Sequence, residues 1–476
     1  MTNSYDIVIG LEVHVELNTR TKIFCGCSTR FGAKPNSQTC PVCTGMPGSL
    51  PVLNKKVVEY AIAVGLATGC AISRVSKFDR KNYFYPDNPQ NYQISQLYFP
   101  ICRNGYVDVE KDSVNKRVRI HEIHMEEDAG KLIHDEESEN SLIDYNRSGV
   151  PLIEIVTEPD MSSADEVVAF LEKLRLIIQY LGVSDCKLNE GSMRVDVNLS
   201  VKRKGDIQLG TRTEIKNLNS FKAISRAIQN ETNRQIEIIE KGLEVHMETR
   251  RWDDTKGESF SMRSKEDSRD YRYFPEPDIL PIEVADEWIC QIRERQPEFK
   301  EDKMIRYMEE YSLPMYDADV LTSNKRMTEI FEDSVNLGAN PKKVSNYLMG
   351  ETLRLLKERN MEPEDICFSP ANLVKLIELV EKGIINGNIA KDIFEKIFDD
   401  NIEPSKYVED NNLKMNTDED SLRNVIEEVI NNNPQSVLDY RSGKDRALGF
   451  LVGQVMKATK GKGNPGIINK ILKEKL

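Results

Sequence analysis

The sequence predicts an α+β protein in which a mixed sheet domain precedes an all-helical region. Stretches of alternating apolar and polar residues, such as EVHVEL, PLIEIV and RVDVNLSVKR, recur from Ile7 to about Pro281. This two-residue period is typical of strands with one buried face. After Pro281 the alternation stops, and apolar residues recur every three or four positions, as they do in amphipathic helices.

Helical spacing also interrupts the sheet-forming part, at residues 57–66, 164–181 and 222–241. This mixture indicates a sheet domain with helices packed against it. In the later region, Ser369 is a candidate N-cap, Pro370 takes the first helical position and Gly383 follows the last turn. These signals predict a helix between residues 370 and 382.

The length of 476 residues exceeds what a single hydrophobic core usually serves, so we expect more than one domain. Helical patterning takes over near residue 295, and a polar stretch with Pro404 runs from 402 to 417. We therefore predict a sheet domain at 1–294, a helical domain at 295–405 and a tail domain at 406–476.

The cellular compartment follows from what the sequence shows at its start and in its cysteines. No apolar run approaches the ~20 residues that a membrane-spanning helix needs. The opening MTNSYDIVIGLEVHVEL alternates like a strand and has no basic segment ahead of an apolar block, unlike a secretion signal. Nine cysteines, an odd number, argue against a disulfide framework. We expect a cytoplasmic protein.

Charge is unevenly distributed along the chain. The whole carries a formal net charge of -13, yet residues 440–476 hold nine Lys or Arg against two acids, a local charge of +7. An acidic body with a basic tail indicates that the two parts of the chain have different tasks.

Four of the cysteines form a cluster in CGCSTRFGAKPNSQTCPVC, namely Cys25, Cys27, Cys40 and Cys43. Two closely spaced thiolate pairs on tight turns can surround a tetrahedral zinc ion. Four protein ligands leave no open position, so the ion would be structural, in a zinc knuckle at 25–43. The alternative is four unrelated thiols, which the polar, loop-like surroundings make less favourable.

Acidic residues recur within the strand-like stretches. Glu12 and His14 lie two apart, so both side chains leave one face of a strand and could share an ion. Further candidates are Glu126, Glu127, Glu154, Glu190, Asp196 and Glu214. Any one of them could belong to a solvated sheet face. Together they would repel one another unless Mg²⁺ and a phosphate-rich ligand lay among them, which suits nucleotide chemistry.

A phosphate-binding loop of the G-x-x-x-x-G-K-[ST] type is absent from the sequence. The phosphates of ATP would therefore have to meet scattered cations. The segment MRSKEDSRDYRYFPEPD offers Arg263, Lys265 and Arg272 within a short span. An exposed, salt-bridged loop is an equally good interpretation of that segment on composition alone.

Several long motifs resemble those of the B-subunit family of the aspartyl/glutamyl-tRNA amidotransferases, and the match runs nearly end to end. They are IGLEVHVEL, HMEEDAGK, RSGVPLIEIVTEPD, EGSMRVDVN, TRTEIKNLNS, DYRYFPEPD and GFLVGQVMKATKGKGNP. The resemblance implies a cradle-like catalytic sheet domain related in fold to glutamine synthetase, then a helical domain and a tail that holds tRNA.

The resemblance also implies an activity and partners. Members of this family use ATP to phosphorylate the side-chain carboxylate of Glu-tRNA(Gln) or Asp-tRNA(Asn). Ammonia then forms the amide, after the glutaminase, or A, subunit has produced it from glutamine and passed it through a channel. The heterotrimer is completed by a small C subunit.

By the same resemblance, the residues of the site acquire roles. His14, Glu127 and Glu214 match the metal ligands, for Mg²⁺ or alternatively Mn²⁺, so we expect Glu127→Gln to abolish phosphoryl transfer. The residues expected to line the same site are Glu12, Glu126, Glu154, Glu190 and Asp196. The residues expected to meet phosphate are Arg194, Lys216, Arg263, Lys265 and Arg272.

Two other functions compete with this interpretation. In the first, the chain is a non-enzymatic tRNA-binding scaffold, and the acidic residues are only a solvated face. In the second, it is a ligase that acts on a free amino acid. The basic tail argues against the second, because a small substrate has no use for it.

Overall fold

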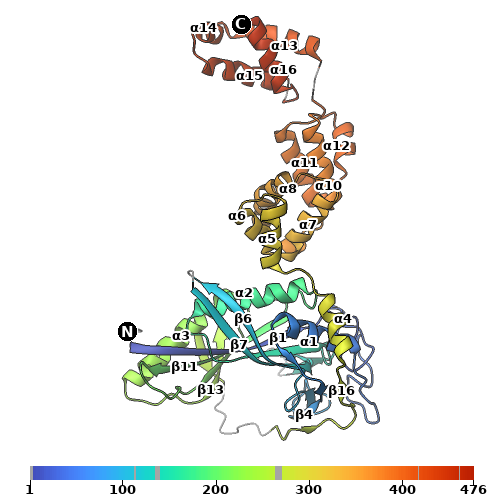
Figure 1. The fold of residues 1–476 in the computed structure, drawn as a ribbon, viewed down its shortest axis with the longest axis vertical. Helices are drawn as coiled ribbons and strands as arrows, with labels where there is room; N and C mark the ends of the chain where they lie inside the picture. Colours follow the sequence, from blue (N-terminus) through green and yellow to red (C-terminus); the bar gives the residue numbers. More distant parts are fainter. Residues whose placement is uncertain (1–3, 112–113, 135–139, 263–270, 416–417, 460) are drawn as a thin grey trace. The chain divides into compact units, whose positions relative to one another are not determined.

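The computed structural model describes residues 4–476, apart from 112–113, 135–139, 263–270, 416–417 and 460. The chain separates into two compact units, Met1–Pro297 and Glu298–Leu476. The first unit contains a large mixed sheet with helices, and the second is helical, as the sequence predicts (Figure 1). No helix among the described residues is long and apolar enough to cross a membrane.

The first unit is built on a nine-stranded sheet in which only the β12–β13 pair is parallel. The long strand β1 lies near the middle of this sheet, between β11 and β10. In spatial order the strands are β14 (Glu258–Ser261), β13 (Glu248–Asp253), β12 (Thr213–Lys216), β11 (Met193–Arg203), β1 (Tyr5–Glu16), β10 (Pro151–Thr157), β7 (Val114–Glu127), β6 (Cys102–Lys111) and β2 (Ala71–Ile72).

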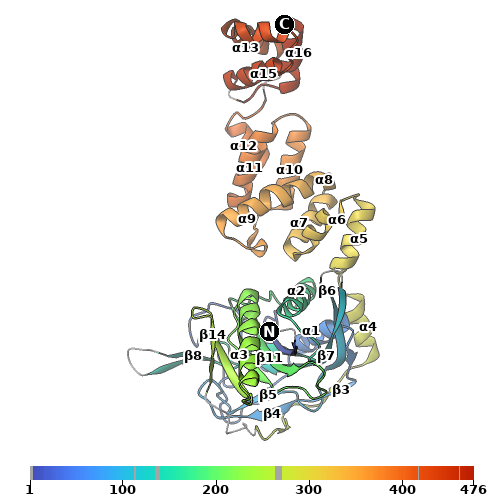
Figure 2. The same cartoon turned by 90° about the vertical axis from the view of Figure 1, so that its left-hand side faces the viewer.

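One face of this sheet carries the hydrophobic core. In β1, Leu11, Val13 and Val15 are fully buried, while the residues between them are partly exposed. Three helices pack on the apolar side, α1 (Lys55–Ala67), α2 (Ala164–Tyr180) and α3 (Phe221–Glu240), and α4 (Asp286–Glu294) packs on α1 (Figure 2). The opposite side of the central strands is left to polar residues.

Local sequence explains where these helices begin. Asn54, Ser163 and Ser220 are the N-caps of α1, α2 and α3, and each side chain accepts a hydrogen bond from a backbone N–H of the first turn. The three helices predicted from apolar spacing match these bounds within two residues. Gly65 lets α1 approach the sheet closely, because a Cβ there would lie 2.4 Å from Cys102 Sγ.

Among the described residues, three smaller sheets, of two or three strands each, lie outside the large sheet. They are β15 (Phe274–Pro275), β4 (Asp79–Asn82) and β5 (Tyr92–Ser95) in one sheet, β16 (Ile282–Glu283) with β3 (Val75–Ser76), and β8 (Lys131–His134) with β9 (Ser141–Asp144). β5 packs against β7, which brings the β4–β5 hairpin to an edge of the polar face.

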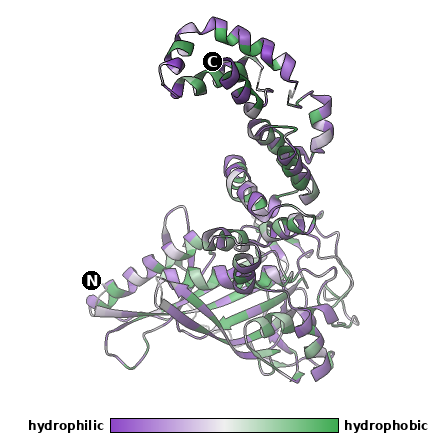
Figure 3. Cartoon of the chain, turned by 45° about the horizontal axis from the view of Figure 1, so that its top comes forward, coloured by the Kyte–Doolittle hydropathy of each residue, from purple (hydrophilic) through white to green (hydrophobic). Residues whose placement is uncertain are grey.

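The second unit contains two separate clusters of buried apolar residues, one drawn from residues 307–408 and one from 422–472. Its α-helices carry both hydrophilic and hydrophobic residues (Figure 3). They are α5 (Lys300–Glu310), α6 (Met315–Thr322), α7 (Lys325–Asn336), α8 (Pro341–Asn346), α9 (Leu353–Arg359), α10 (Pro370–Glu381), α11 (Gly387–Asp400), α12 (Pro404–Asp410), α13 (Glu419–Asn432), α14 (Pro434–Arg441), α15 (Arg446–Ala458) and α16 (Pro465–Lys475). The helix predicted between Ser369 and Gly383 is α10, with Ser369 as N-cap and Pro370 first.

Candidate active site and metal centre

The polar face of the central strands gathers most of the charged residues predicted for the site. Because side chains alternate along a strand and neighbouring strands are in register, these residues form rows across the sheet. His14 lies opposite Glu154 of β10 and Arg194 of β11, and Glu154 lies opposite His124 of β7. In the next row, Glu12 lies opposite Asp196.

The first metal-binding candidate on this face is a cluster of His14, Glu126 and Glu154, whose ligand atoms lie within 4.8 Å of one another. His14 Nε2 is 3.4 Å from Glu154 Oε2 and 3.6 Å from Glu126 Oε1. His124 Nε2 lies 3.0 Å from the same Glu154 oxygen. Burial opposes the charge on His14, but Glu154 and Glu126 outweigh it and raise the pKa of His14. In the same way the pKa of His124 rises to about 10.

The second cluster consists of Glu12, Asp196 and Glu214, again with ligand atoms within 4.8 Å of one another. Burial, and then the negative charges of Glu154 and Glu214, raise the pKa of Glu12. Lys216 Nζ donates to Asp196 at 2.6 Å and lies 2.9 Å from Glu214. One ammonium among three carboxylates leaves excess negative charge, which suits a hard cation.

A third group on the same face joins Glu16, Asp128 and Arg194. The Arg194 guanidinium donates to both oxygens of Asp128, at 3.3 and 2.9 Å. Although burial opposes ionisation, Arg194 and Arg147 hold the pKa of Asp128 below its usual value. Burial and the neighbouring Asp128 raise the pKa of Glu16 to about 8. Arg194 is therefore engaged by a carboxylate beside the two clusters.

The strand that carries Glu214 is fixed from the apolar side by a buried polar network. Thr213 Oγ1 donates to Glu231 Oε1 of α3 at 2.7 Å, and Gln235 Nε2 donates to the same oxygen at 2.8 Å. Arg234 also donates to Glu231, so the buried carboxylate has its charge balanced. This network fixes β12 to α3, with Glu214 facing the site.

The structure thus separates residues that the sequence prediction groups together. His14 belongs to the first cluster, whereas Glu12 and Glu214 belong to the second. Glu127 belongs to neither, because it follows Glu126 in β7 and points to the other side of the strand. Its Oε1 accepts the backbone N–H of Ile94 at 2.9 Å.

The other predicted residues have different outcomes. Glu190 lies in the turn before β11, where it pairs with Lys187 at 2.9 Å, away from both clusters. Arg272 is exposed and has a positive φ of 44°. Arg263 and Lys265 lie outside the described residues.

Sequence reasoning missed some residues of this face. His124 and Asn198 belong to it, and Asn198 Nδ2 donates to Glu12 Oε1 at 2.9 Å. Alternation supplied a signal for both, because His124 shares its face with Glu126 and Asn198 shares its face with Asp196. Lys81 of β4 had no such signal, since only tertiary packing brings β4 near β7.

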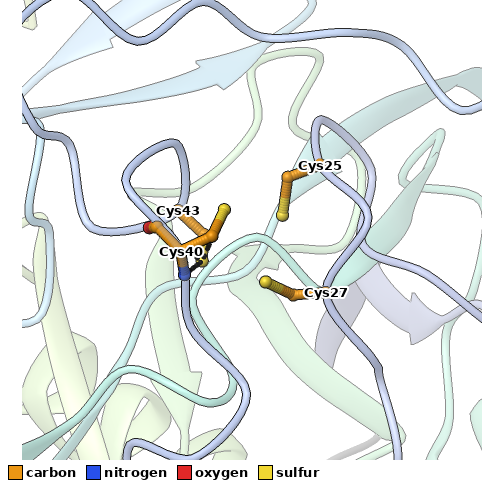
Figure 4. A group of neighbouring side chains, drawn as sticks. All are labelled: Cys25, Cys27, Cys40 and Cys43. Atoms are coloured by element: carbon orange, nitrogen blue, oxygen red, sulfur yellow. Dashed lines mark hydrogen bonds between the residues drawn. The ribbon is translucent and has the colours of Figure 1, made fainter.

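The four clustered cysteines converge, as Figure 4 shows. Cys25 and Cys27 face Cys40 and Cys43 across a small gap, and the four Sγ atoms lie within 4.8 Å of one another. Cys40 and Cys43 have their sulfurs 3.9 Å apart, close to the ~3.8 Å expected for two thiolates on one tetrahedral zinc. The quartet can therefore hold a metal ion, and its donor atoms are those that zinc prefers.

The surroundings of the quartet favour a thiolate at Cys43 alone, because a hydrogen bond with Cys43 and burial raise the pKa of Cys25, and burial raises the pKa of Cys27 to about 11. A hydrogen bond from Cys25, the backbone N–H of Cys40 and the buried Lys22 ammonium lower the pKa of Cys43 to about 4. A small cavity, with room for about one water molecule, lies beside the cluster and is lined by Lys22, Cys25, Cys43, Gln90 and Glu127 among others. Glu127 thus lies beside the cysteine cluster.

Comparisons with known proteins agree along the whole chain. Residues 7–290 match the family model described as the GatB/GatE catalytic domain, and residues 329–476 match the GatB domain. A protein of Agathobacter rectalis, the B subunit of aspartyl/glutamyl-tRNA(Asn/Gln) amidotransferase, is 65% identical over 99% of this chain and 100% of its own length. Proteins of the same description from Lachnospira eligens and Lachnoclostridium phytofermentans are 64% and 60% identical, each over 99% of both chains.

Proposed function

The chain belongs to the B-subunit family of the aspartyl/glutamyl-tRNA amidotransferases, and from that membership we propose how its polar sheet face performs the reaction. The chain is a subunit of the tRNA-dependent amidotransferase that forms Gln-tRNA and Asn-tRNA. Our proposal is that its first unit activates the side-chain carboxylate of Glu-tRNA(Gln), Asp-tRNA(Asn) or both with ATP.

The chemistry requires activation because a carboxylate oxygen is a poor leaving group toward ammonia. In the proposed first step, a carboxylate oxygen of the substrate attacks the γ-phosphorus of ATP and ADP leaves, which gives an acyl phosphate. In the second step ammonia attacks the acyl carbon, inorganic phosphate leaves and the nitrogen gives up a proton. Phosphoryl transfer of this kind depends chiefly on positioning and on neutralising phosphate charge.

The observation that carries this proposal is the convergence of two acidic clusters on one sheet face. The His14–Glu126–Glu154 and Glu12–Asp196–Glu214 clusters each present ligand atoms within 4.8 Å of one another. A divalent cation held there would neutralise the phosphates of ATP, and Mg²⁺ suits the carboxylates. The imidazole of His14 makes Mn²⁺ the alternative for the first cluster. A solvated face would not bury Glu126, which is 3% exposed.

The cations of the face have complementary roles in this proposal. Lys216 holds Asp196 and Glu214 at fixed positions and offers its charge to a phosphoryl oxygen. Arg194, engaged by Asp128, supports the edge of the site instead of approaching it freely. Arg272 is proposed to meet phosphate from the segment that follows β14, and Arg263 and Lys265 stay predictions from the resemblance.

The proposal also covers the form of the domains and the partner subunits. We propose that the sheet domain has a cradle-like form related to glutamine synthetase, that residues 295–405 form a helical domain and that 406–476 form the tRNA-binding tail. A glutaminase subunit would supply ammonia through a channel, and the heterotrimer would be completed by a small third subunit. An acyl phosphate must be kept from water, which is a physical reason for channelled ammonia. The cysteine quartet is proposed to hold a structural zinc ion.

Amidation of charged tRNA tests the proposal. The purified chain, alone and with its partner subunits, is incubated with ATP, Mg²⁺, ammonium chloride and either Glu-tRNA or Asp-tRNA. We expect amide formation with stoichiometric ADP release, and none with glutamine unless the glutaminase subunit is present. tRNA binding without ADP release would support the scaffold function instead, and equal activity on free glutamate would support a free-amino-acid ligase.

A further inference from the structure

A cavity of about 320 Å³ lies at the edge of the polar face and takes part in neither acidic cluster. Its lining combines three aromatic rings with both signs of charge: Lys81, Tyr83, Tyr85, Asp87, Gln93 and Tyr271. Tyr83 and Tyr271 meet edge to face with ring centroids 6.4 Å apart, and Lys81 Nζ lies 4.9 Å from the Tyr271 ring.

The loop that carries Asp87 is held rigidly by its own hydrogen bonds. Tyr83 N–H donates to Asn91 O at 3.1 Å, and Asn88 Nδ2 donates to Tyr83 O at 2.9 Å. The carbonyl of Asp87 itself accepts Gly130 N–H at 2.8 Å. A Cβ at residue 130 would lie 3.1 Å from that oxygen, so glycine permits the close approach. The backbone at Asp87 is therefore held in place before any ligand arrives.

One of the two carboxylate oxygens of Asp87 is enclosed by protein. Oδ1 is buried and has no hydrogen-bond partner among the residues that the structure describes. Such an acceptor is costly, because it has lost water and gained nothing in return. Because Oδ1 is enclosed by protein, Oδ2 is the carboxylate oxygen of Asp87 that is left to meet a ligand in the cavity.

The cavity adjoins the acidic clusters closely enough for their charges to act on its lining. Burial opposes the charge on Lys81, but Glu126, Tyr273, Tyr271 and Glu154 raise its pKa. Lys81 thus lines the cavity and is near enough to Glu126 and Glu154 for their charges to act on it. A group bound in the cavity would lie beside the site where the substrate carboxylate is activated.

We propose that this cavity binds the aminoacyl group of the charged tRNA, with Asp87 accepting the α-ammonium group. This inference rests on the proposed function and names how its substrate is held. A carboxylate among tyrosine rings recognises an ammonium ion through a charge-assisted hydrogen bond and cation–π contacts. Lys81 offers the opposite charge to the side-chain carboxylate, which only a few covalent bonds separate from the α-nitrogen. The lining therefore suits a zwitterionic amino acid ester.

The test combines a substitution with a chemical change of the substrate, in the complete complex with its partner subunits. Asp87→Asn should raise the KM for Glu-tRNA about 10- to 100-fold, the range expected for one charged hydrogen bond, with kcat nearly unchanged. Glu-tRNA acetylated at the α-amino group should show a similar loss with the wild-type chain. That acetylation should cost little further in Asp87→Asn, since the same interaction is already gone. Asp206→Asn, in an exposed turn, is the matched control.

Each of the following outcomes would contradict the inference, and a different outcome would contradict the proposed function. If the wild-type protein amidates Glu-tRNA equally well with and without the α-amino acetyl group, it does not recognise the α-ammonium group. If acetylation costs the same in both proteins, its effect is steric and not exerted through Asp87. If Asp87→Asn raises the KM for ammonium chloride and not that for Glu-tRNA, the cavity serves the nitrogen donor. Absence of amidation by wild-type protein, in contrast, would contradict the proposed function itself.

Discussion

Two adjacent glutamates of β7, Glu126 and Glu127, have different surroundings. Consecutive side chains leave a strand on opposite sides. Glu126 therefore reaches His14 on the polar face, whereas Glu127 accepts a hydrogen bond from Ile94 and lines the small cavity beside Cys25 and Cys43. A single step along the chain thus decides between a position in the candidate metal cluster and a position beside the cysteine cluster.

The two isosteric variants Glu126→Gln and Glu127→Gln separate these positions. We expect Glu126→Gln to weaken Mn²⁺ binding at least about tenfold and to lower ADP formation accordingly, since an amide is a poor replacement for a ligating carboxylate. Glu127→Gln should keep Mn²⁺ affinity, and tRNA affinity should be unchanged in both. Electron paramagnetic resonance titration with Mn²⁺ measures the first quantity directly. Loss of Mn²⁺ affinity only in Glu127→Gln would support the ligand set predicted from the resemblance.

Glu16 gives the sheet unit a dependence on pH. Its pKa is raised from 4.5 to about 8, chiefly by burial and then by Asp128. Between these values the folded protein keeps a proton that the unfolded chain has released, so the free energy of unfolding falls as pH rises through this window. Glu16→Gln cannot ionise, and its stability relative to the wild type should increase by about 1–3 kcal/mol from pH 5 to pH 8.5.

Urea unfolding at the two pH values measures this difference. Tryptophan fluorescence reports only the sheet unit, because both tryptophans, Trp252 and Trp288, lie in it. Glu110→Gln, at an exposed position of β6, is the control. Parallel pH profiles for Glu16→Gln and the wild type would show that Glu16 does not hold the proton.

At the scale of elements, the cysteine segment fastens one end of the sheet unit. Asn36 N–H donates to Asp144 at 2.9 Å, Tyr145 N–H donates to Asn36 Oδ1 at 2.8 Å, and Ser148 Oγ donates to Cys43 O at 3.0 Å. The long segment between β1 and α1 is therefore attached to the chain that enters β10. With no regular secondary structure of its own, this segment depends on such links and on the zinc ion that we propose for the quartet.

Removal of the metal should loosen this attachment. Cys43→Ser, or chelation of the wild-type protein, is expected to release one zinc per chain and to lower the stability of the sheet unit by several kcal/mol. Zinc content by mass spectrometry and the urea midpoint from tryptophan fluorescence measure both effects. Cys290→Ser, an exposed single cysteine, should change neither. An unchanged midpoint after complete zinc loss would contradict a structural role.

At the scale of the whole molecule, the two units differ in the charge that they present to a ligand. The sheet unit gathers carboxylates around the site, while the last helices expose cations. Two of these cations are paired with acids of α13, because Lys470 lies 3.3 Å from Glu419 and Lys475 pairs with Glu427. Lys457 and Lys462 make no ion pair within the described part of the chain, and Lys460 lies outside it. Lys457 and Lys462 are thus available to a phosphate backbone.

Replacement of Lys457 and Lys462 by alanine should weaken tRNA binding without affecting activation chemistry. Each lost phosphate contact should lower the slope of log Kd against log salt by slightly less than one, so the pair should lower it by roughly 1.4–1.8. Filter binding across a salt series measures the slope, and ADP formation at saturating tRNA checks the chemistry. Lys382→Ala with Lys391→Ala removes one charge at the C-cap of α10 and one from α11 as the control. An unchanged slope in the tail variant would place the tRNA contact elsewhere.

The sequence by itself determines features that depend on neighbouring residues, and it determines the family through the order of several motifs. Alternation predicts the strands, N-caps and apolar spacing predict α1, α2, α3 and α10, and motif order identifies the family. The spacing of Cys25, Cys27, Cys40 and Cys43 predicts their convergence, because two short thiolate pairs on turns need few other constraints.

Only the tertiary structure decides how the acidic residues are grouped. Alternation places Glu12 and His14 on one face, yet the order and register of the neighbouring strands assign Asp196 to one and Glu154 to the other. The same folding leaves Glu190 in a turn and brings Asp87 and Tyr271 to one cavity. Strand order and register are set by long-range pairing and core packing, which local patterns do not encode. The sequence therefore predicts which residues carry the chemistry, and the sheet decides which of them act together.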